Sequence, residues 1–206
     1  IKLNRDSKIL DIGCGRGKIV SNLSTKLRLK NKPQGIDITN HKDKDKRIKF
    51  RKIDALSFFS KNKNKFDLIL IKQTIHLLDL NKIKKLLTLS KKNLSAKGRI
   101  FIFTLETDNN QLPTFKLMKK KLIKSLQRDK MILKMITKLY PYRIKKNFTY
   151  KVKIIKKSYL KMIQNRYIST LLPLTKEELL KGIKEINLKN KNNIKFNDKL
   201  ICVILQ

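Results

Sequence analysis

Cysteine is nearly missing from this sequence of 206 residues, and so are the long apolar runs of membrane proteins. The two cysteines, Cys14 and Cys202, stand far apart, which excludes a disulfide framework and a multi-cysteine zinc site. No run approaches the ~18 apolar residues that span a bilayer, and no apolar segment near the start has the form of a signal peptide. We therefore expect a protein of the reduced cytoplasm that binds no metal and no membrane.

Acidic residues and arginine are also scarce. The chain has 15 acidic and 52 basic residues, of which nine are Arg and 43 are Lys, giving a net charge of +37. Lys, Ile and Asn are abundant while Ala, Gly, Pro and Arg are rare, as an A+T-rich genome would produce; selection for an acidic partner is the alternative. Phosphates and base edges are usually recognised by Arg, which this chain lacks. The charge predicts nonspecific attraction to nucleic acid, but it does not by itself indicate the function of the protein.

The apolar pattern indicates one α/β domain over residues 1–206. Strands are expected at residues 8–12, 33–38, 48–53, 66–71 and 99–105, and helices at 18–30 and 73–93. This alternation predicts a doubly wound parallel sheet whose strand ends meet at one edge. Residues 106–192 then form a mostly helical insertion, with one strand-like stretch at 148–155. A hairpin around Asn197-Asp198 is expected to complete the core, which comprises residues 8–105 and 193–205.

A glycine turn follows the first expected strand. Gly13, Gly15 and Gly17 allow the backbone to approach a ligand and to turn into a helix. A nicotinamide dinucleotide site is the competing interpretation, but the spacing is Gly-x-Gly-x-Gly and not Gly-x-Gly-x-x-Gly. Asp11 would also place a carboxylate where a pyrophosphate should bind, whereas it suits a cationic amine.

Two further aspartates stand at expected strand ends. Asp37 ends the second strand, where a carboxylate can accept both hydroxyls of a ribose. Asp54, followed by Ala55, ends the third strand, where it can accept from an exocyclic adenine amine. The alternative for both is an exposed aspartate without a ligand.

Together these residues resemble the class I S-adenosylmethionine-dependent methyltransferase family. Asp11-Ile-Gly-Cys-Gly-Arg-Gly17 is similar to its first motif, Gly35-Ile-Asp37-Ile38 to its second, and Asp54-Ala55 to its adenine-edge motif. The family's fourth strand and the turn after it are similar to residues 66–78, Phe66-Asp-Leu-Ile-Leu-Ile-Lys-Gln-Thr-Ile-His76-Leu-Leu78. Many members have two histidines in this turn, and this sequence has one of them, His76. The implied fold is a Rossmann-like seven-stranded sheet with an antiparallel last strand.

The resemblance implies S-adenosylmethionine as the cofactor and leaves the insertion to select the acceptor. The implied cofactor-binding residues are Asp11, Gly13, Cys14, Gly15, Gly17, Asp37, Ile38, Asp54, Ala55, Ile71 and Lys72. His76 is the candidate general base, with a structural role at a helix start as the alternative.

Within the insertion, residues 162–171 and 177–183 resemble segments of members that methylate carboxylic acids. Arg166 and Tyr167 are therefore expected to hold a small anionic acceptor, because Arg pairs with a carboxylate through two hydrogen bonds. RNA methylation is the alternative, and it depends on the charge alone. A non-catalytic or incomplete cofactor-binding fragment is a third interpretation, because the chain begins at Ile1 and lacks the helical residues that usually precede the first strand.

Overall fold

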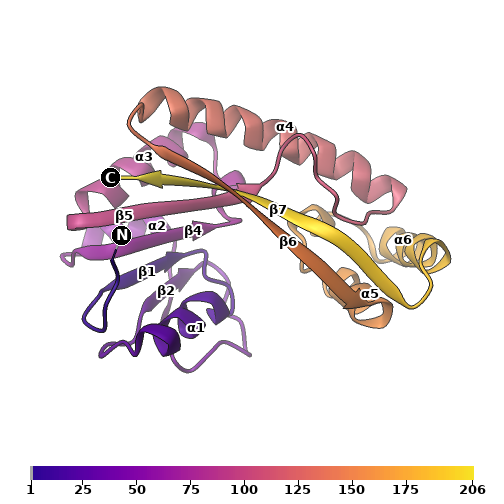
Figure 1. Cartoon of the computed structure of the whole chain (residues 1–206), viewed down its shortest axis with the longest axis horizontal. Coiled ribbons are helices and arrows are strands. Elements are labelled where there is room, and N and C mark those ends of the chain that lie inside the picture. Colours follow the sequence, from indigo (N-terminus) through magenta and orange to yellow (C-terminus); the bar gives the residue numbers. More distant parts are fainter. Residues whose placement is uncertain (1) are drawn as a thin grey trace. The chain divides into compact units, whose positions relative to one another are not determined.

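The structure is a computed structural model that describes residues 2–206 (Figure 1). Its chain forms two compact units. Unit 1 comprises the chain up to Thr104, together with Ile136–Lys146 and Ile201–Gln206. Unit 2 comprises Leu105–Met135 and Asn147–Leu200.

Unit 1 contains the parallel strands that the sequence predicts. They are β1 (Ile9–Ile12), β2 (Gln34–Asp37), β3 (Lys49–Lys52), β4 (Phe66–Lys72) and most of β5 (Leu94–Leu105). Asp11 lies opposite Gly35 of β2 and Leu70 of β4, and Asp37 lies opposite Lys52 of β3. These registers bring the carboxyl ends of the four strands to one edge of the sheet.

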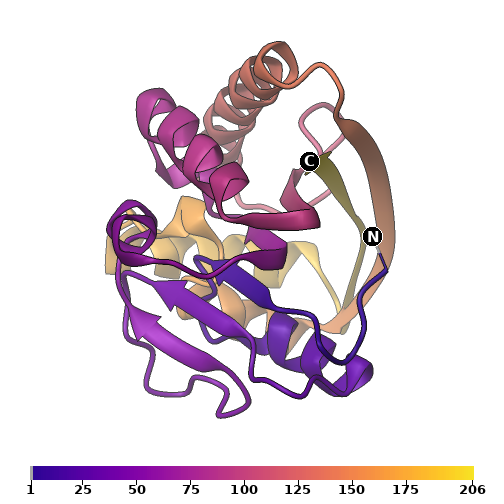
Figure 2. The same ribbon diagram turned by 90° about the vertical axis from the view of Figure 1, so that its left-hand side faces the viewer.

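Helices cover both faces of this sheet. Figure 2 shows α1 (Lys18–Leu27) on one face and α2 (Ala55–Lys61) and α3 (Leu80–Lys92) on the other. A short 3-10 helix, η1 (Ile75–Leu77), lies between β4 and α3. The inner strands β1 and β4 are mostly apolar and buried, as a sheet covered on both faces requires, whereas the edge strand β3 is charged and exposed.

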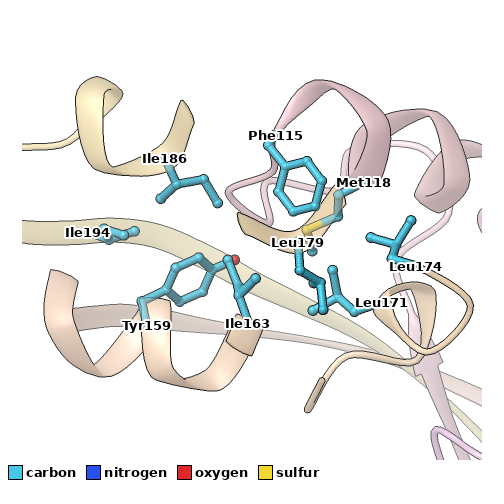
Figure 3. Packing of buried hydrophobic residues seen from close by; sticks show 9 residues of the cluster. All are labelled: Phe115, Met118, Tyr159, Ile163, Leu171, Leu174, Leu179, Ile186 and Ile194. Carbon is cyan, nitrogen blue, oxygen red and sulfur yellow. The ribbon is translucent and has the colours of Figure 1, made fainter. Parts of the chain in front are cut away.

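Unit 2 has a separate apolar core. It is built from α4 (Lys116–Leu139), α5 (Lys156–Gln164), η2 (Ser169–Leu171) and α6 (Lys176–Lys189), with parts of β6 (Ile144–Ile155) and β7 (Asn193–Leu205). Figure 3 shows this core, in which Tyr159 and Phe115 are the largest buried side chains. The Tyr159 hydroxyl donates to the carbonyl oxygen of Pro113 at 2.6 Å, so its polar atom is satisfied inside the apolar cluster. Thr175 caps α6 through a capping box with Glu178.

The complete sheet has seven strands in the order β3-β2-β1-β4-β5-β7-β6. The arrow of β7 runs opposite to those of β5 and β6 in Figure 1, so the predicted seven-stranded sheet with an antiparallel last strand is confirmed. Strand β6 is the edge strand, and its lysines Lys145, Lys146, Lys151 and Lys153 are exposed. Within residues 2–206, no helix is long and apolar enough to cross a membrane.

The predicted closing hairpin is wrong. Asn197 and Asp198 are typical turn residues, but they lie inside one continuous strand, β7. Strand β7 lies between β5 and β6, and beyond the end of β5 the N–H of Asn197 donates to the side chain of Gln111 at 3.3 Å, so long-range contacts override the local turn preference. The sixth strand of the sheet is instead β6, which begins at Ile144 within the segment expected to be a mostly helical insertion.

Candidate cofactor site

The glycine turn adopts the backbone conformation that its sequence predicts. Gly13, Gly15 and Gly17 have φ angles of 69°, 53° and 71°, in the left-handed region that side chains disfavour. The N–H groups of Gly13 and Cys14 both donate to the carbonyl oxygen of Ile36, which ties the turn to β2. A Cβ atom on Gly13 would overlap Thr74, and one on Gly17 would overlap Ile48, whereas Gly15 faces open space. The turn therefore presents bare backbone at Gly15.

Asp37 holds this turn in place from the end of β2. Its Oδ2 accepts from the N–H of Gly15 at 2.8 Å, and its Oδ1 accepts from the N–H of Thr39 at 2.8 Å. Each carboxylate oxygen has a second lone pair, so the group can still accept hydroxyl hydrogens from a ligand.

Asp11 is an acid enclosed beneath the turn. Its side chain is only 3% exposed, and burial raises its pKa from the usual value of 3.8 to about 7, while the charge of Lys72 lowers the pKa and that of Asp37 raises it. The neighbouring Cys14 thiol has its pKa raised to about 12 by burial and by the charges of Asp11 and Asp37. The thiol is therefore protonated at neutral pH, and Cys14 is no nucleophile.

A cavity of about 430 Å³ lies at the carboxyl ends of these strands. This volume is within the range of small-molecule sites. Its lining residues are Ile12, Gly13, Ile36, Asp37, Ile38, Ile53, Asp54, Ala55, Leu56, Lys72, Gln73, Thr74, Leu77, Leu78 and Lys82. Six of them, Gly13, Asp37, Ile38, Asp54, Ala55 and Lys72, are residues that the family resemblance implied.

Four of the other five implied residues adjoin the lining, and the fifth, Gly17, is the N-cap residue of α1. Asp11 and Ile71 are buried strand residues that adjoin Ile12 and Lys72. Gly15 is bonded to the lining residue Asp37. The sulfur of the half-buried Cys14 interacts with the carbonyl oxygen of Gly15.

Apolar side chains of the cavity remain open to solvent. Ile38 is 67% exposed and Leu77 is 58% exposed, which is unusual for large apolar residues. They offer apolar surface against which a flat ring can pack.

Asp54 has a second role in the fold, because it caps α2. Its Oδ1 accepts from the N–H groups of Leu56 and Ser57, each at 3.0 Å, and the hydrogen bonds at Ser57 are the largest cause of its lowered pKa. Asp54 therefore presents an ionised carboxylate to the cavity.

The segment after β4 supplies lining residues that sequence reasoning missed. Gln73, Thr74, Leu77, Leu78 and Lys82 all line the cavity. The Thr74 hydroxyl donates to the carbonyl oxygens of Lys72 and Gly13, at 3.0 and 3.4 Å, and so joins this segment to the glycine turn. The signal available was position alone: Gln73 and Thr74 directly follow a strand that ends at the ligand edge.

The remaining candidate residues do not line this cavity. His76 is half-buried in η1, between lining residues Thr74 and Leu77. Arg166 belongs to unit 2, where its Nη1 donates to the carbonyl oxygens of Leu171 and Leu172 at 2.7 and 3.0 Å. The adjacent Tyr167 is half exposed.

Unit 2 has its own cavity of about 600 Å³, along one side of α4. Its apolar lining includes Leu122, Ile123 and Leu126, and its charged lining includes an ion pair of 2.7 Å between Asp108 and Lys130. Three of its 12 lining residues are lysines, which is close to the lysine share of the whole chain, 43 of 206. The lining therefore indicates no particular class of ligand.

Comparison with known proteins identifies the family. A family model described as a methyltransferase domain matches residues 3–166. The chain therefore belongs to this methyltransferase family, and the resemblance to class I S-adenosylmethionine-dependent methyltransferases predicted from the motifs is confirmed. A search of curated proteins found no match.

Solved structures of methyltransferases have a similar fold. A protein assigned as a methyltransferase of an antibiotic biosynthesis pathway, from Anabaena variabilis, has a TM-score of 0.60 and 15% identity, over 98% of this chain and 92% of that one. An S-adenosylmethionine-dependent methyltransferase from Archaeoglobus fulgidus has a TM-score of 0.55 and 18% identity, over 97% and 85%. The plantazolicin methyltransferase BpumL, solved with a pentazolic desmethylPZN analog and SAH, has a TM-score of 0.54 and 19% identity, over 97% and 76%.

Proposed function

We propose that this chain binds S-adenosylmethionine in the cavity of unit 1 and transfers its methyl group to a small molecule, with carboxylic acids as the leading class of acceptor. One observation carries the cofactor assignment: Asp37 and the bare backbone of Gly15 meet at 2.8 Å at a cavity on the carboxyl edge of a parallel sheet. Ligands of doubly wound sheets bind at this edge.

The residues around the cavity fit the cofactor chemically. Asp37 can accept from the two ribose hydroxyls, and Ile38 and Leu77 provide apolar surface for the adenine. Asp54 offers a carboxylate acceptor for the adenine amine, and Asp11 offers a carboxylate for the ammonium of the amino-acid end. A nicotinamide dinucleotide fits less well, because the carboxylate of Asp11 would repel its pyrophosphate.

The protein's own contribution is to align the acceptor and to exclude water. When bound, the cofactor supplies an electrophilic methyl group on a sulfonium. Leu77 and Leu78 line the same cavity and can shield it from solvent. A carboxylate acceptor needs no general base, because it is already ionised at neutral pH. For a hydroxyl or amine acceptor, His76 is the proposed base. Because His76 is half-buried in η1 and does not line the cavity, its ring would have to turn toward the cavity to accept a proton.

For the acceptor we propose Arg166 and Tyr167 as the residues that bind its anionic group. Arg166 uses Nη1 for two backbone carbonyls, which leaves Nε and Nη2 to pair with a carboxylate. The desmethylPZN complex of BpumL, a protein of similar fold, supports a small-molecule or peptide acceptor. The lysine-rich surface supports only nonspecific attraction to RNA.

Two measurements test the proposal. Calorimetric titration with S-adenosylmethionine and with NAD⁺ decides the cofactor; saturable binding of NAD⁺ alone would refute the assignment. Radiolabelled cofactor, offered with small carboxylic acids, small amines and alcohols, and total RNA at high salt, then decides the acceptor. Incorporation into RNA at a defined nucleotide, with none into small molecules, would establish an RNA methyltransferase instead.

A further inference from the structure

Gln73 has a strained backbone at the edge of the cofactor cavity. Its φ angle is 54°, in the left-handed region where non-glycine residues are uncommon. Its N–H donates to the carbonyl oxygen of Phe103 at 2.9 Å, and the next residue, Thr74, is bonded to Gly13. The fold thus holds Gln73 in an unfavourable conformation from both neighbouring strands, as is typical of functional sites.

The side chain of Gln73 is unsatisfied as well. It lines the cavity, yet its Nε2 is buried and has no hydrogen-bond partner within residues 2–206. A buried amide donor without a partner is unfavourable, and such groups in folded proteins usually have a specific reason. A ligand oxygen in the cavity would supply the missing partner.

The charges nearby indicate which part of the ligand this is. Strand β4 pairs with β1, with Asp11 opposite Leu70 and Ile12 opposite Ile71, so Lys72 and Gln73 follow next to the glycine turn. Lys72 is close enough to lower the pKa of Asp11 by its charge. A carboxylate, an ammonium and an amide donor thus belong to residues at the adjoining ends of β1 and β4. This combination matches an α-amino acid group, whose ammonium suits Asp11 and whose carboxylate suits Lys72 and Gln73.

We propose that Gln73 is a cofactor-positioning residue whose Nε2 donates to the carboxylate of the amino-acid end of S-adenosylmethionine. The inference rests on the proposed function, because it assumes that the cofactor binds in this cavity. It explains both the strain at Gln73 and its unpaired amide by one ligand contact.

The test compares two ligands that differ in this group alone. S-adenosylhomocysteine has the amino-acid end, whereas 5′-methylthioadenosine has the same adenosine and thioether without it. The variant Gln73→Met keeps the side-chain length and removes the donor. We expect it to weaken S-adenosylhomocysteine about 10- to 100-fold in calorimetry, as for a lost hydrogen bond to a charged group, and to leave methylthioadenosine unchanged.

Controls separate this contact from a structural effect. Gln34→Met makes the same change at the start of β2, away from its ligand end, and should change neither affinity. Gln73→Glu keeps the side-chain shape and should also lose S-adenosylhomocysteine selectively, which provides a second variant if Gln73→Met unfolds. Equal weakening of both ligands, or no weakening, would overturn the inference while leaving the cofactor site intact. Failure of the unaltered protein to bind S-adenosylhomocysteine would instead overturn the proposed function.

Discussion

Cofactor affinity is expected to fall as the pH is lowered from 8 to 6, because Asp11 must be ionised to attract the ligand's ammonium. In the ligand-free protein, burial raises the pKa of Asp11 to about 7. A bound cation favours the ionised carboxyl group, so binding releases a proton from the fraction of molecules in which Asp11 is protonated. The proton therefore competes with the cofactor.

The magnitude follows from this pKa. A carboxyl group with a pKa of about 7 is about 90% ionised at pH 8 and about 10% ionised at pH 6. The apparent dissociation constant of S-adenosylhomocysteine should then rise about 10-fold over this range, which corresponds to about 1.4 kcal/mol. Titration of the ligand itself changes this little, because the carboxylate beside its α-amino group favours the ammonium form throughout this range.

Calorimetry at pH 6, 7 and 8 measures the effect, and two variants assign it. Asp11→Asn cannot ionise, so it should bind S-adenosylhomocysteine weakly and with no fall in affinity toward pH 6. Asp6→Asn alters an exposed acid that pairs with Lys30, and it should keep the full pH dependence. A flat profile in the unaltered protein, or the same slope in Asp11→Asn, would refute the reasoning.

Three further outcomes are expected. Asp37→Ala should weaken S-adenosylhomocysteine by about 1.5–3 kcal/mol, or roughly 10- to 150-fold, and an unchanged affinity in the folded variant would exclude Asp37 as the ribose acid. Asp129, which is 2% exposed in α4, has its pKa raised from 3.8 to about 6 by burial, so its ionisation destabilises the fold increasingly as the pH rises from about 4 to about 6 and fully above that. Asp129→Asn should therefore raise the free energy of unfolding by about 3 kcal/mol at pH 8 and by nothing below pH ~4; an equal gain at both pH values would contradict this. Gel-shift assays should find RNA binding that fades between ~50 and ~200 mM salt, without methylation of a defined nucleotide.

The parts of the site that the sequence predicted are those encoded locally. Gly13 and Gly17 require left-handed backbone, and Asp37 ends a strand at the ligand edge, so neighbouring residues suffice to place them. Gln73 and Leu78 could not be assigned in this way. Their place in the cavity depends on where the chain turns after β4, and that turn is set by long-range bonds from Gln73 to Phe103 and from Thr74 to Gly13.

The errors in the predicted secondary structure have a related cause. The second part of strand β6 was predicted, because apolar residues alternate at 148–155, but its first four residues, 144–147, are exposed and, except for Ile144, polar, and they carry no such alternation. Helix α2 has only seven residues, too few for a clear helical period, and its capping residue Asp54 was interpreted as a ligand-binding acid alone. At Asn197, the position of β7 within the sheet and a hydrogen bond to the side chain of Gln111 outweigh the turn preference of the local sequence.

The lysines of β6 also bear on how the protein behaves in solution. An edge strand presents unpaired backbone groups that can template association with another chain, and charged side chains on the strand are a common protection. Protection of this kind is electrostatic, and the Debye length shrinks from about 10 Å at 0.1 M salt to about 3 Å at 1 M. High salt, which would strip bound nucleic acid from so basic a chain, thus also weakens the repulsion that keeps one β6 edge from pairing with another. Purification therefore has an intermediate optimum of ionic strength, between nucleic-acid contamination and aggregation.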